Sequence, residues 1–457
     1  DVRRGKTLRR LAGDDSTVNE EWNCDKGRWA FKYVTALDRL THPLVRNAEG
    51  ELVQASWPEA LAAAAAGLKG KRAAVLTGGR VTTEDAYGYS KFARIALGTN
   101  DIDYRARVTS DEERDFLAAH VAGSSTTYRD IDTADHVALV AFEPEEESPI
   151  VFLRLNKNFK KRGLKVSAVA TKGSIAMDKL KADFIKVAPG AESAAVAGLA
   201  LTAKSVILVG ERASESAGLF TSVAALAAKT GAKVAYIPRR AGERGALEAG
   251  ALGNVLPGGR PVMDAAARVD IAAAWGVDSL PATPGRSASE IIDALTSGDL
   301  DAVVVGGVDA LDLPHGREAI AALKKSFVVS LEIAPSSVTA VADVVLPVAA
   351  ITEKSGSFLN WEGRARAFDS AVADSHNRSD VRILSMLADA LGNPISLGTV
   401  TSSAREFNQL GSWDGSRVQL APVAAGTAKS VSGNDALLSS WRRLLDMGSL
   451  QKGEDNL

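Results

Sequence analysis

Short apolar segments alternate with helical segments along most of the chain, and this alternation constrains the fold more than any other feature. Amphipathic helices are predicted, for example, at residues 150–160, 220–230 and 317–326. A helix that connects two strands of one sheet returns the chain to its starting edge, so the strands run parallel. The pattern therefore predicts an α/β protein with doubly wound parallel sheets. The predicted strands are 73–77, 136–142, 165–170, 206–209, 233–237, 302–305, 327–331 and 344–346.

The composition is that of a globular protein with a packed core, and it excludes several classes of function. Hydrophobic residues make up 46% of the 457 residues and charged residues 24%, and this length suggests about three domains. Lysine and arginine number 54 against 56 acidic residues, so no positive excess points to nucleic acid. No apolar segment approaches the length that spans a bilayer, so we expect no direct membrane insertion and no signal peptide. The single cysteine excludes an intramolecular disulfide and fits a reducing cytoplasm.

This cysteine, Cys24, lies in a charged segment at residues 18–28. Lys26 and Arg28 place positive charge beside it, and Gly27 lets the backbone approach a bulky neighbour. An iron–sulfur cluster is held by thiolates, carries net negative charge and responds to nearby charges and donors, so the segment suits the last ligand of such a cluster. A structural cysteine at the start of a helix explains the same residues without a metal.

One acidic loop follows a predicted strand, where open α/β sheets bind their ligands. It spans residues 142–149 and contains Glu143, Glu145, Glu146 and Glu147. These carboxylates would repel a phosphate, and they could occupy a helix N-terminus themselves. The simpler interpretation is an acidic helix cap without a binding role.

Two further loops are candidates for ligand contact. Residues 306–314 begin with two glycines that could cradle a phosphate, but Asp309 and Asp312 oppose it, which favours a plain strand-to-helix turn. Residues 352–366 would either close a cavity or meet a neighbouring subunit, or they would form a simple hairpin.

No standard catalytic motif is present. There is no nucleophile elbow, P-loop or dinucleotide fingerprint. The lysine-rich run at 157–162 is predicted to be a solvated helix end, where it suits the helix dipole. The histidines are scattered without metal-binding spacing, at His42, His120, His136, His315 and His376.

Four segments resemble the molybdopterin oxidoreductase superfamily, in the order found there. They are most similar to the large G subunits of bacterial NADH:quinone oxidoreductase, which is respiratory complex I. The similarity covers roughly residues 2 to 395. The segments are Asn19 to Arg28; Asp38-Arg39-Leu40 with Pro43 to Arg46 and Ser56 to Leu61; Arg244 to Ala251 with Leu256 to Arg260; and Ala342 to Pro347 with Glu353 to Gly356 and Asn360 to Arg364.

The resemblance implies a fold of the formate dehydrogenase and DMSO reductase type, preceded by a small iron–sulfur module. Residues 1–46 would end the [4Fe–4S] module, residues 48–130 plus 200–395 would form one α/β domain, and residues 131–200 would form a second, inserted α/β domain. Residues 396–457 are predicted to be a loop-rich segment with a final helix around Trp441. The chain would be a fragment that lacks an N-terminal ferredoxin-like part, with three cluster cysteines, and a C-terminal barrel.

The resemblance also implies a function. The chain would be a scaffold and electron-transfer subunit of the proton-pumping NADH:quinone oxidoreductase, in contact with other peripheral-arm subunits, in the cytoplasm on the inner face of the plasma membrane. Cys24 would be the fourth thiolate of a [4Fe–4S] cluster. The residues expected around that cluster are Asn19, Trp22, Lys26, Gly27 and Arg28.

No molybdopterin is expected, and the isolated chain would have no active site of its own. No cysteine follows Cys24 to ligate molybdenum, and glutamates fill the loop where the enzymes grip the pyrophosphate of their cofactor. The alternative is a catalytic molybdopterin oxidoreductase of the formate dehydrogenase or nitrate reductase type, in which Ser or Asp would ligate the metal.

Overall fold

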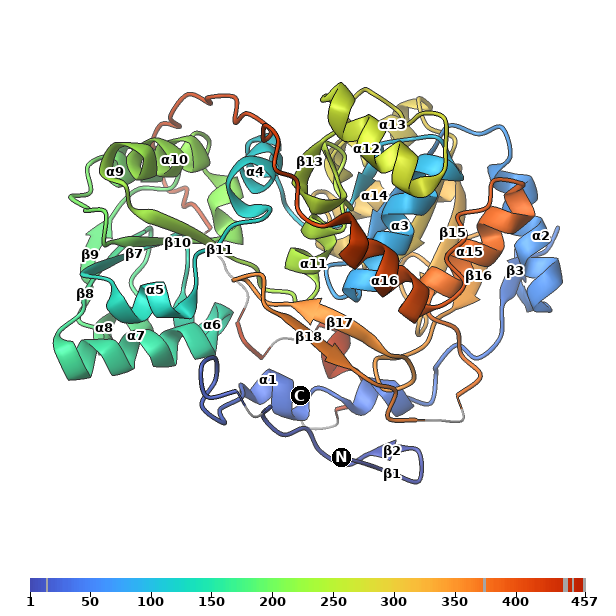
Figure 1. Ribbon diagram of the computed structural model, residues 1–457, viewed down its shortest axis with the longest axis horizontal. Coiled ribbons are helices and arrows are strands. Elements are labelled where there is room, and N and C mark those ends of the chain that lie inside the picture. Colours follow the sequence, from blue (N-terminus) through green and yellow to red (C-terminus); the bar gives the residue numbers. More distant parts are fainter. Residues whose placement is uncertain (14, 373–374, 439–442, 446–447, 455–457) are drawn as a thin grey trace. The chain divides into compact units, whose positions relative to one another are not determined.

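The structure, a computed structural model, describes residues 1–457 except 14, 373–374, 439–442, 446–447 and 455–457. The chain divides into two compact units. The first comprises residues 1–36, 110–239 and 419–457, and the second comprises residues 37–109 and 240–418. Each unit is built on a largely parallel sheet with helices packed against it (Figure 1), which confirms the predicted α/β class.

The first unit holds a five-stranded sheet in which neighbouring strands are all parallel. Starting from β7, the chain adds β8 and β9 on one side and then returns to add β10 and β11 on the other. The two halves therefore diverge between β7 and β10, and a crevice of this kind is where α/β proteins bind ligands. The strands, in spatial order, are β11 (Lys233–Ile237), β10 (Val206–Gly210), β7 (His136–Val140), β8 (Lys165–Ala170) and β9 (Asp183–Lys186).

Helices cover both faces of this sheet (Figure 1). Every residue of β7 and β10 is buried, as expected for strands covered on both sides. The long helix α7 begins with Pro149 in its first turn and ends at Gly163, whose φ of 67° is typical of a helix C-terminus. The helices of the α/β part are α4 (Asp111–Phe116), α5 (Tyr128–Thr133), α6 (Pro144–Glu147), α7 (Pro149–Arg162), α8 (Ile175–Lys179), α9 (Glu192–Ala197) and α10 (Leu219–Thr230).

The second unit holds a seven-stranded mixed sheet. Strands β16, β15, β14, β5 and β6 are parallel, and β3 and β4 add an antiparallel edge. Alternate residues of the central strands, such as Leu76, Val303 and Val345, pack into one apolar core with helices α13 and α14. The strands, in spatial order, are β4 (Leu52–Gln54), β3 (Leu44–Arg46), β16 (Val344–Pro347), β15 (Phe327–Glu332), β14 (Ala302–Gly306), β5 (Ala73–Thr77) and β6 (Ile102–Asp103).

The first helix of this unit begins where the sequence predicts. Ser56 and Glu59 form a capping box, in which each side chain accepts a hydrogen bond from the other residue's amide (3.4 and 2.9 Å). The remaining elements are two hairpins and a set of helices. They are α2 (Trp57–Leu68), α3 (Thr83–Ile95), α11 (Glu243–Glu248), β12 (Val255–Leu256), β13 (Arg260–Pro261), α12 (Ala265–Trp275), α13 (Ala288–Ser297), α14 (Gly316–Lys325), β17 (Gly356–Leu359), β18 (Ala365–Phe368), α15 (Asp380–Leu391) and α16 (Val400–Leu410).

The N-terminal 36 residues form a small module with little core. A hairpin of β1 (Val2–Arg3) and β2 (Lys6–Thr7) precedes the short helix α1 (Asp25–Trp29). Among the residues described in this module, only Ala30 and Val34 are buried.

The domain boundaries differ from those predicted. Strands β10 and β11 were expected in the domain that resumes at residue 200, but they complete the sheet of the first unit, in which Val206 pairs with Val137. Strand β3 was expected at the end of the iron–sulfur module, but it pairs with β16 in the second unit. The alternation of strands and helices predicts eight of the twelve strands in the two sheets, though not β3, β4, β6 and β9, and it does not specify which sheet a crossover returns to.

The C-terminal segment was predicted to be loop-rich, and most of residues 396–430 lie outside helices and strands. The exception is α16, which Thr399 and Ser402 cap and Phe407 anchors against Tyr87 (ring centroids 5.6 Å apart). Part of the predicted final helix, including Trp441, falls on residues outside those described.

Candidate functional site

Cys24 occupies the N-cap of α1. Its Sγ accepts a hydrogen bond from the backbone N–H of Gly27 at 3.3 Å, and amide donors of this kind tune the sulfur ligands of iron–sulfur clusters. The side chain is half-buried. A Cβ placed on Gly27 would lie 3.5 Å from this sulfur, which is ordinary contact, so nothing described in the structure requires glycine there. The role of Gly27 beside a bulky group stays a prediction.

The other predicted site residues lie in α1 or in the turn before it. Asn19 donates to the carbonyls of Trp22 (2.8 Å) and Gly13 (3.3 Å) and so shapes the turn. Arg28 donates to the side chain of Asn23 (2.9 Å). Trp22 is 62% exposed. The structure thus brings these residues together through short-range contacts along one segment.

A second exposed aromatic side chain, Trp29, completes α1 and was missed by the sequence reasoning. It is 55% exposed. Trp22 and Trp29 are seven positions apart, and two exposed aromatic side chains within one short module are a reason to look for a partner surface there. The structure therefore adds Trp29 to the candidate site.

Helix α7 fixes the loop that leads to Cys24. Arg154 donates to the carbonyls of Thr17 (2.7 Å) and Val18 (2.8 Å). Lys157 pairs with Glu20, and this hydrogen bond lowers the pKa of the Glu20 carboxyl. Lys157, the first lysine of the run that was predicted to be solvated, is 40% exposed, and a segment distant in sequence supplies its partner.

The residues present fit one ligand of an iron–sulfur cluster and no more. A [4Fe–4S] cluster takes four thiolates, and Cys24 is the only cysteine of the sequence. Among the residues that the structure describes, no group of three or more His, Cys, Asp or Glu side chains is arranged to hold a metal ion. Any further thiolate ligands have to come from outside these 457 residues.

The acidic loop after β7 satisfies its own helix N-terminus. Glu143 caps α6 and accepts from the amide of Glu146 (2.7 Å). Glu147 accepts from the amide of Glu143 (3.1 Å) and from the guanidinium of Arg212 (2.9 Å). The predicted acidic helix cap is therefore present.

Glu147 fills the space between the carboxyl ends of β7 and β10. Its side chain is 1% exposed, and its Oε2 has no hydrogen-bond partner. A Cβ placed on Gly210, at the end of β10, would lie 3.0 Å from that oxygen. Burial raises the pKa of the Glu147 carboxyl, although Arg212 opposes the shift. A buried carboxylate thus stands at the switch point of this sheet.

The loop after β14 is the plain turn that the sequence favoured. Asp309 accepts from the amide of Leu311 (3.0 Å) and from the hydroxyl of Ser337 (2.7 Å). Gly307 adopts a φ of 63°, and a Cβ on Gly78 would lie 2.2 Å from its carbonyl oxygen. Backbone and carboxylate therefore fill this strand end.

The third predicted loop contains the antiparallel hairpin of β17 and β18. Glu353, just before it, makes a two-pronged ion pair with Arg39 (both distances 2.9 Å). Burial alone would raise the pKa of Glu353, but hydrogen bonds from Arg39 and other donors hold it below its usual value. Figure 1 shows the hairpin as a separate two-stranded element.

Lys354 ties this hairpin to the core of the second unit, a role that the sequence did not reveal. Its ammonium donates to Asp85 (2.5 Å) and Asp380 (3.0 Å). Tyr89 donates to the other oxygen of Asp380 (3.0 Å). Burial would lower the pKa of Lys354, but the two carboxylates outweigh burial and raise it. The group is a buried ion-pair network that joins α3, α15 and the hairpin.

No helix among the described residues is long and apolar enough to cross a bilayer.

Comparison with known proteins agrees with the resemblance seen in the sequence. The G subunit of NADH-quinone oxidoreductase from Streptomyces coelicolor is 49% identical over 100% of this chain and 59% of its own length. The protein of the same name from Mycobacterium tuberculosis has the same identity and the same coverage of both chains. This chain therefore spans 59% of the length of these curated relatives.

Solved structures share the fold at low sequence identity. Acetylene hydratase from Pelobacter acetylenicus superposes with a TM-score of 0.56 at 14% identity, covering 85% of this chain and 67% of its own. This likeness concerns the fold alone.

Residues 39–390 match the family described as molybdopterin oxidoreductase. The chain belongs to the molybdopterin oxidoreductase family.

Proposed function

We propose that this chain is part of a G subunit of a proton-pumping NADH:quinone oxidoreductase. In that subunit it serves as a scaffold and contributes one ligand to an iron–sulfur cluster. The observation that carries the proposal is the 49% identity to the Streptomyces coelicolor protein over the whole chain. The subunit would assemble with other peripheral-arm subunits in the cytoplasm, on the inner face of the plasma membrane. We expect the NADH site to lie outside this chain.

The glutamates at the strand ends of the first unit support the proposal that this fold has no pterin site of its own. A phosphate about 4 Å from an ionised carboxylate is opposed by about 4 kcal/mol per charge pair at an effective dielectric constant near 20. At the N-terminus of α6, the side chain of Glu143 already accepts the hydrogen bond that the amide could otherwise donate to a phosphate. Glu147 occupies the space beside Gly210. The residues present do not fit an anionic nucleotide at this crevice.

The segment around Cys24 supports the iron–sulfur assignment. When bound, a [4Fe–4S] cluster supplies a one-electron carrier. Cys24 would contribute one thiolate, and the Gly27 amide would hydrogen-bond the sulfur. Lys26 and Arg28 would offset the negative charge of the cluster. Trp22 and Trp29 would exclude water from it, which lowers the local dielectric constant around the metal.

The test is a pair of substitutions in the full-length subunit within its complex. Changing Cys24→Ser should remove one tetranuclear signal from the electron paramagnetic resonance spectrum and lower the iron content by about four atoms per subunit. Gly27→Ala should lower occupancy of the same cluster. The matched control is Gly173→Ala, whose Cβ meets the same 3.5 Å contact elsewhere in the first unit. Unchanged iron content and spectra in Cys24→Ser would refute the ligand assignment.

A further inference from the structure

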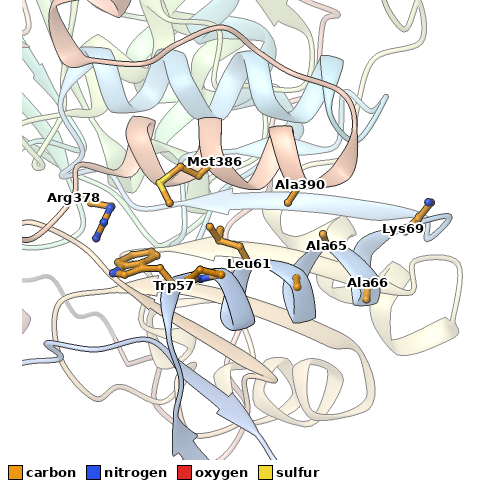
Figure 2. Close-up of a pocket in the computed structure, with 10 residues that line it drawn as sticks. Trp57, Leu61, Ala65, Ala66, Lys69, Arg378, Met386 and Ala390 are labelled. Atoms are coloured by element: carbon orange, nitrogen blue, oxygen red, sulfur yellow. The ribbon is translucent and has the colours of Figure 1, made fainter.

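An open groove lies between helices α2 and α15 of the second unit. In Figure 2, Trp57, Leu61 and Ala65 of α2 face Met386 and Ala390 of α15 across it. Its volume is about 720 Å³, within the range of roughly 300–1,000 Å³ that is usual for binding clefts. The groove is large enough to receive side chains from another molecule.

The charged residues that line the groove are all of one sign. Two of its lining residues, Lys69 and Arg378, are cationic, and none of the ten carries a carboxylate. Figure 2 shows them at opposite ends of the apolar floor. The guanidinium of Arg378 lies 4.4 Å from the ring centroid of Trp57, a cation–π contact that holds it at its end. The whole chain has a net charge of −2, so these two cations are a local feature.

The walls of the groove allow close approach of a helix. Ala62 and Ala66 are exposed and lie one turn apart on α2, beside the exposed Pro58. Small side chains let another helix come near, and Met386 on the facing wall is a flexible side chain that adapts to what it contacts. Helix α2 has 12 residues, so the floor is about 18 Å long, enough for about three helical turns.

We propose that the groove between α2 and α15 is the docking site for an amphipathic helix of a partner subunit, with an apolar face and acidic residues at both ends. Helices in grooves are read through apolar anchors at helical spacing, and opposite charges set their register. The apolar floor matches the apolar face of such a helix, and the cations at both ends of the floor match its acidic residues. The inference rests on the proposed function, in which the chain assembles with other subunits.

The experiment places a small photoreactive diazirine amino acid at position 66 of the full-length subunit, in cells that assemble the complex. After irradiation, the captured peptide is sequenced by mass spectrometry. We expect one partner-subunit segment with apolar residues at helical spacing and Asp or Glu near both ends. The double variant Lys69→Glu with Arg378→Glu should lower the cross-link yield by about tenfold, because it removes two exposed ion pairs with the partner helix and replaces them with repulsion.

The control position is Ala273, another exposed alanine, on α12. A yield at position 66 no higher than at position 273 would overturn the proposal, as would capture of a basic segment, a lipid or a second copy of this chain. Co-purification with the partner subunits separates the two proposals. If the complex assembles without the cross-link, the docking site is wrong and the proposed function stands; if no partner subunit co-purifies, the proposed function itself fails.

Discussion

The strand ends of the α/β units and the segment around Cys24 satisfy their polar groups in opposite ways. At the strand ends, carboxylates and cations are buried against one another, as for Glu147 with Arg212 and for Lys354 with Asp85. Around Cys24, contacts join neighbouring residues, α7 holds the loop that precedes the cysteine, and the tryptophans face solvent. A region that completes its own interactions needs no ligand, whereas a region with little core depends on what it binds. The comparison therefore distinguishes the α/β units, which provide the fold, from the Cys24 segment, where we expect the function.

The largest expected effect comes from the buried lysine. Changing Lys354→Met leaves Asp85 and Asp380 buried without their cation, which should cost about 3–5 kcal/mol of the free energy of unfolding. Chemical denaturation measures the loss. The exposed Lys324→Met on α14 is the control and should change little. The loss in the free energy of unfolding caused by Lys354→Met should be smaller when Asp380→Asn is present as well. A loss below about 1 kcal/mol would show that the network is not what holds the hairpin.

The next effect concerns the hydrogen bonds by which α7 holds the loop before Cys24. Changing Arg154→Met removes the donors to Thr17 and Val18 and should raise amide exchange of residues 15–24 by about tenfold, equal to about 1.4 kcal/mol. Hydrogen exchange followed by mass spectrometry reports it. Arg129→Met, an exposed arginine on α5, is the control. Equal exchange in both variants would mean that the loop before Cys24 is held in another way.

A smaller effect is expected at the switch point of the first unit. Because burial raises the pKa of Glu147 in the folded state, the unfolded chain loses this proton first. Stability from this group therefore falls as pH rises from about 4.5, the ordinary value, through the raised folded value. Glu147→Gln should flatten this dependence and gain on the order of 1 kcal/mol at neutral pH, since it removes a buried charged oxygen without a partner. Glu145→Gln, two residues away and more exposed, is the comparison variant, and a steeper dependence in Glu147→Gln would contradict the assignment.

The smallest effect should be that of Cys24→Ser on the stability of the 457-residue chain itself. Helix α1 buries no residue, and serine is a good N-cap, so the free energy of unfolding should change by less than about 0.5 kcal/mol. Thermal and chemical denaturation test this. A loss of several kcal/mol would make Cys24 a structural residue and would support the simpler interpretation of the sequence.

Much of the fold was predictable because its signals are local. The strand around Val303 is an unbroken apolar run, and Ser56 with Glu59 marks a helix start by spacing alone. The partition into sheets was not predictable, because the pairing of Val206 with Val137 depends on a crossover and not on either segment.

The candidate site divides in the same way. Cys24 and its neighbours are adjacent in sequence, so one segment was enough to propose them, although Trp29 was overlooked there. The contact of Arg154 with Val18 and that of Lys354 with Asp85 join residues more than a hundred positions apart. Nothing in the local sequence distinguishes these cations from solvated ones.

The molybdopterin oxidoreductase fold is proposed to serve here without its own pterin site. The most direct test is the molybdenum and tungsten content of the full-length subunit, purified from its own cells and measured by elemental mass spectrometry. The account predicts well below one metal atom per chain. A stoichiometric amount of either metal would contradict it and would make serine and aspartate side chains at the strand ends the ligand candidates.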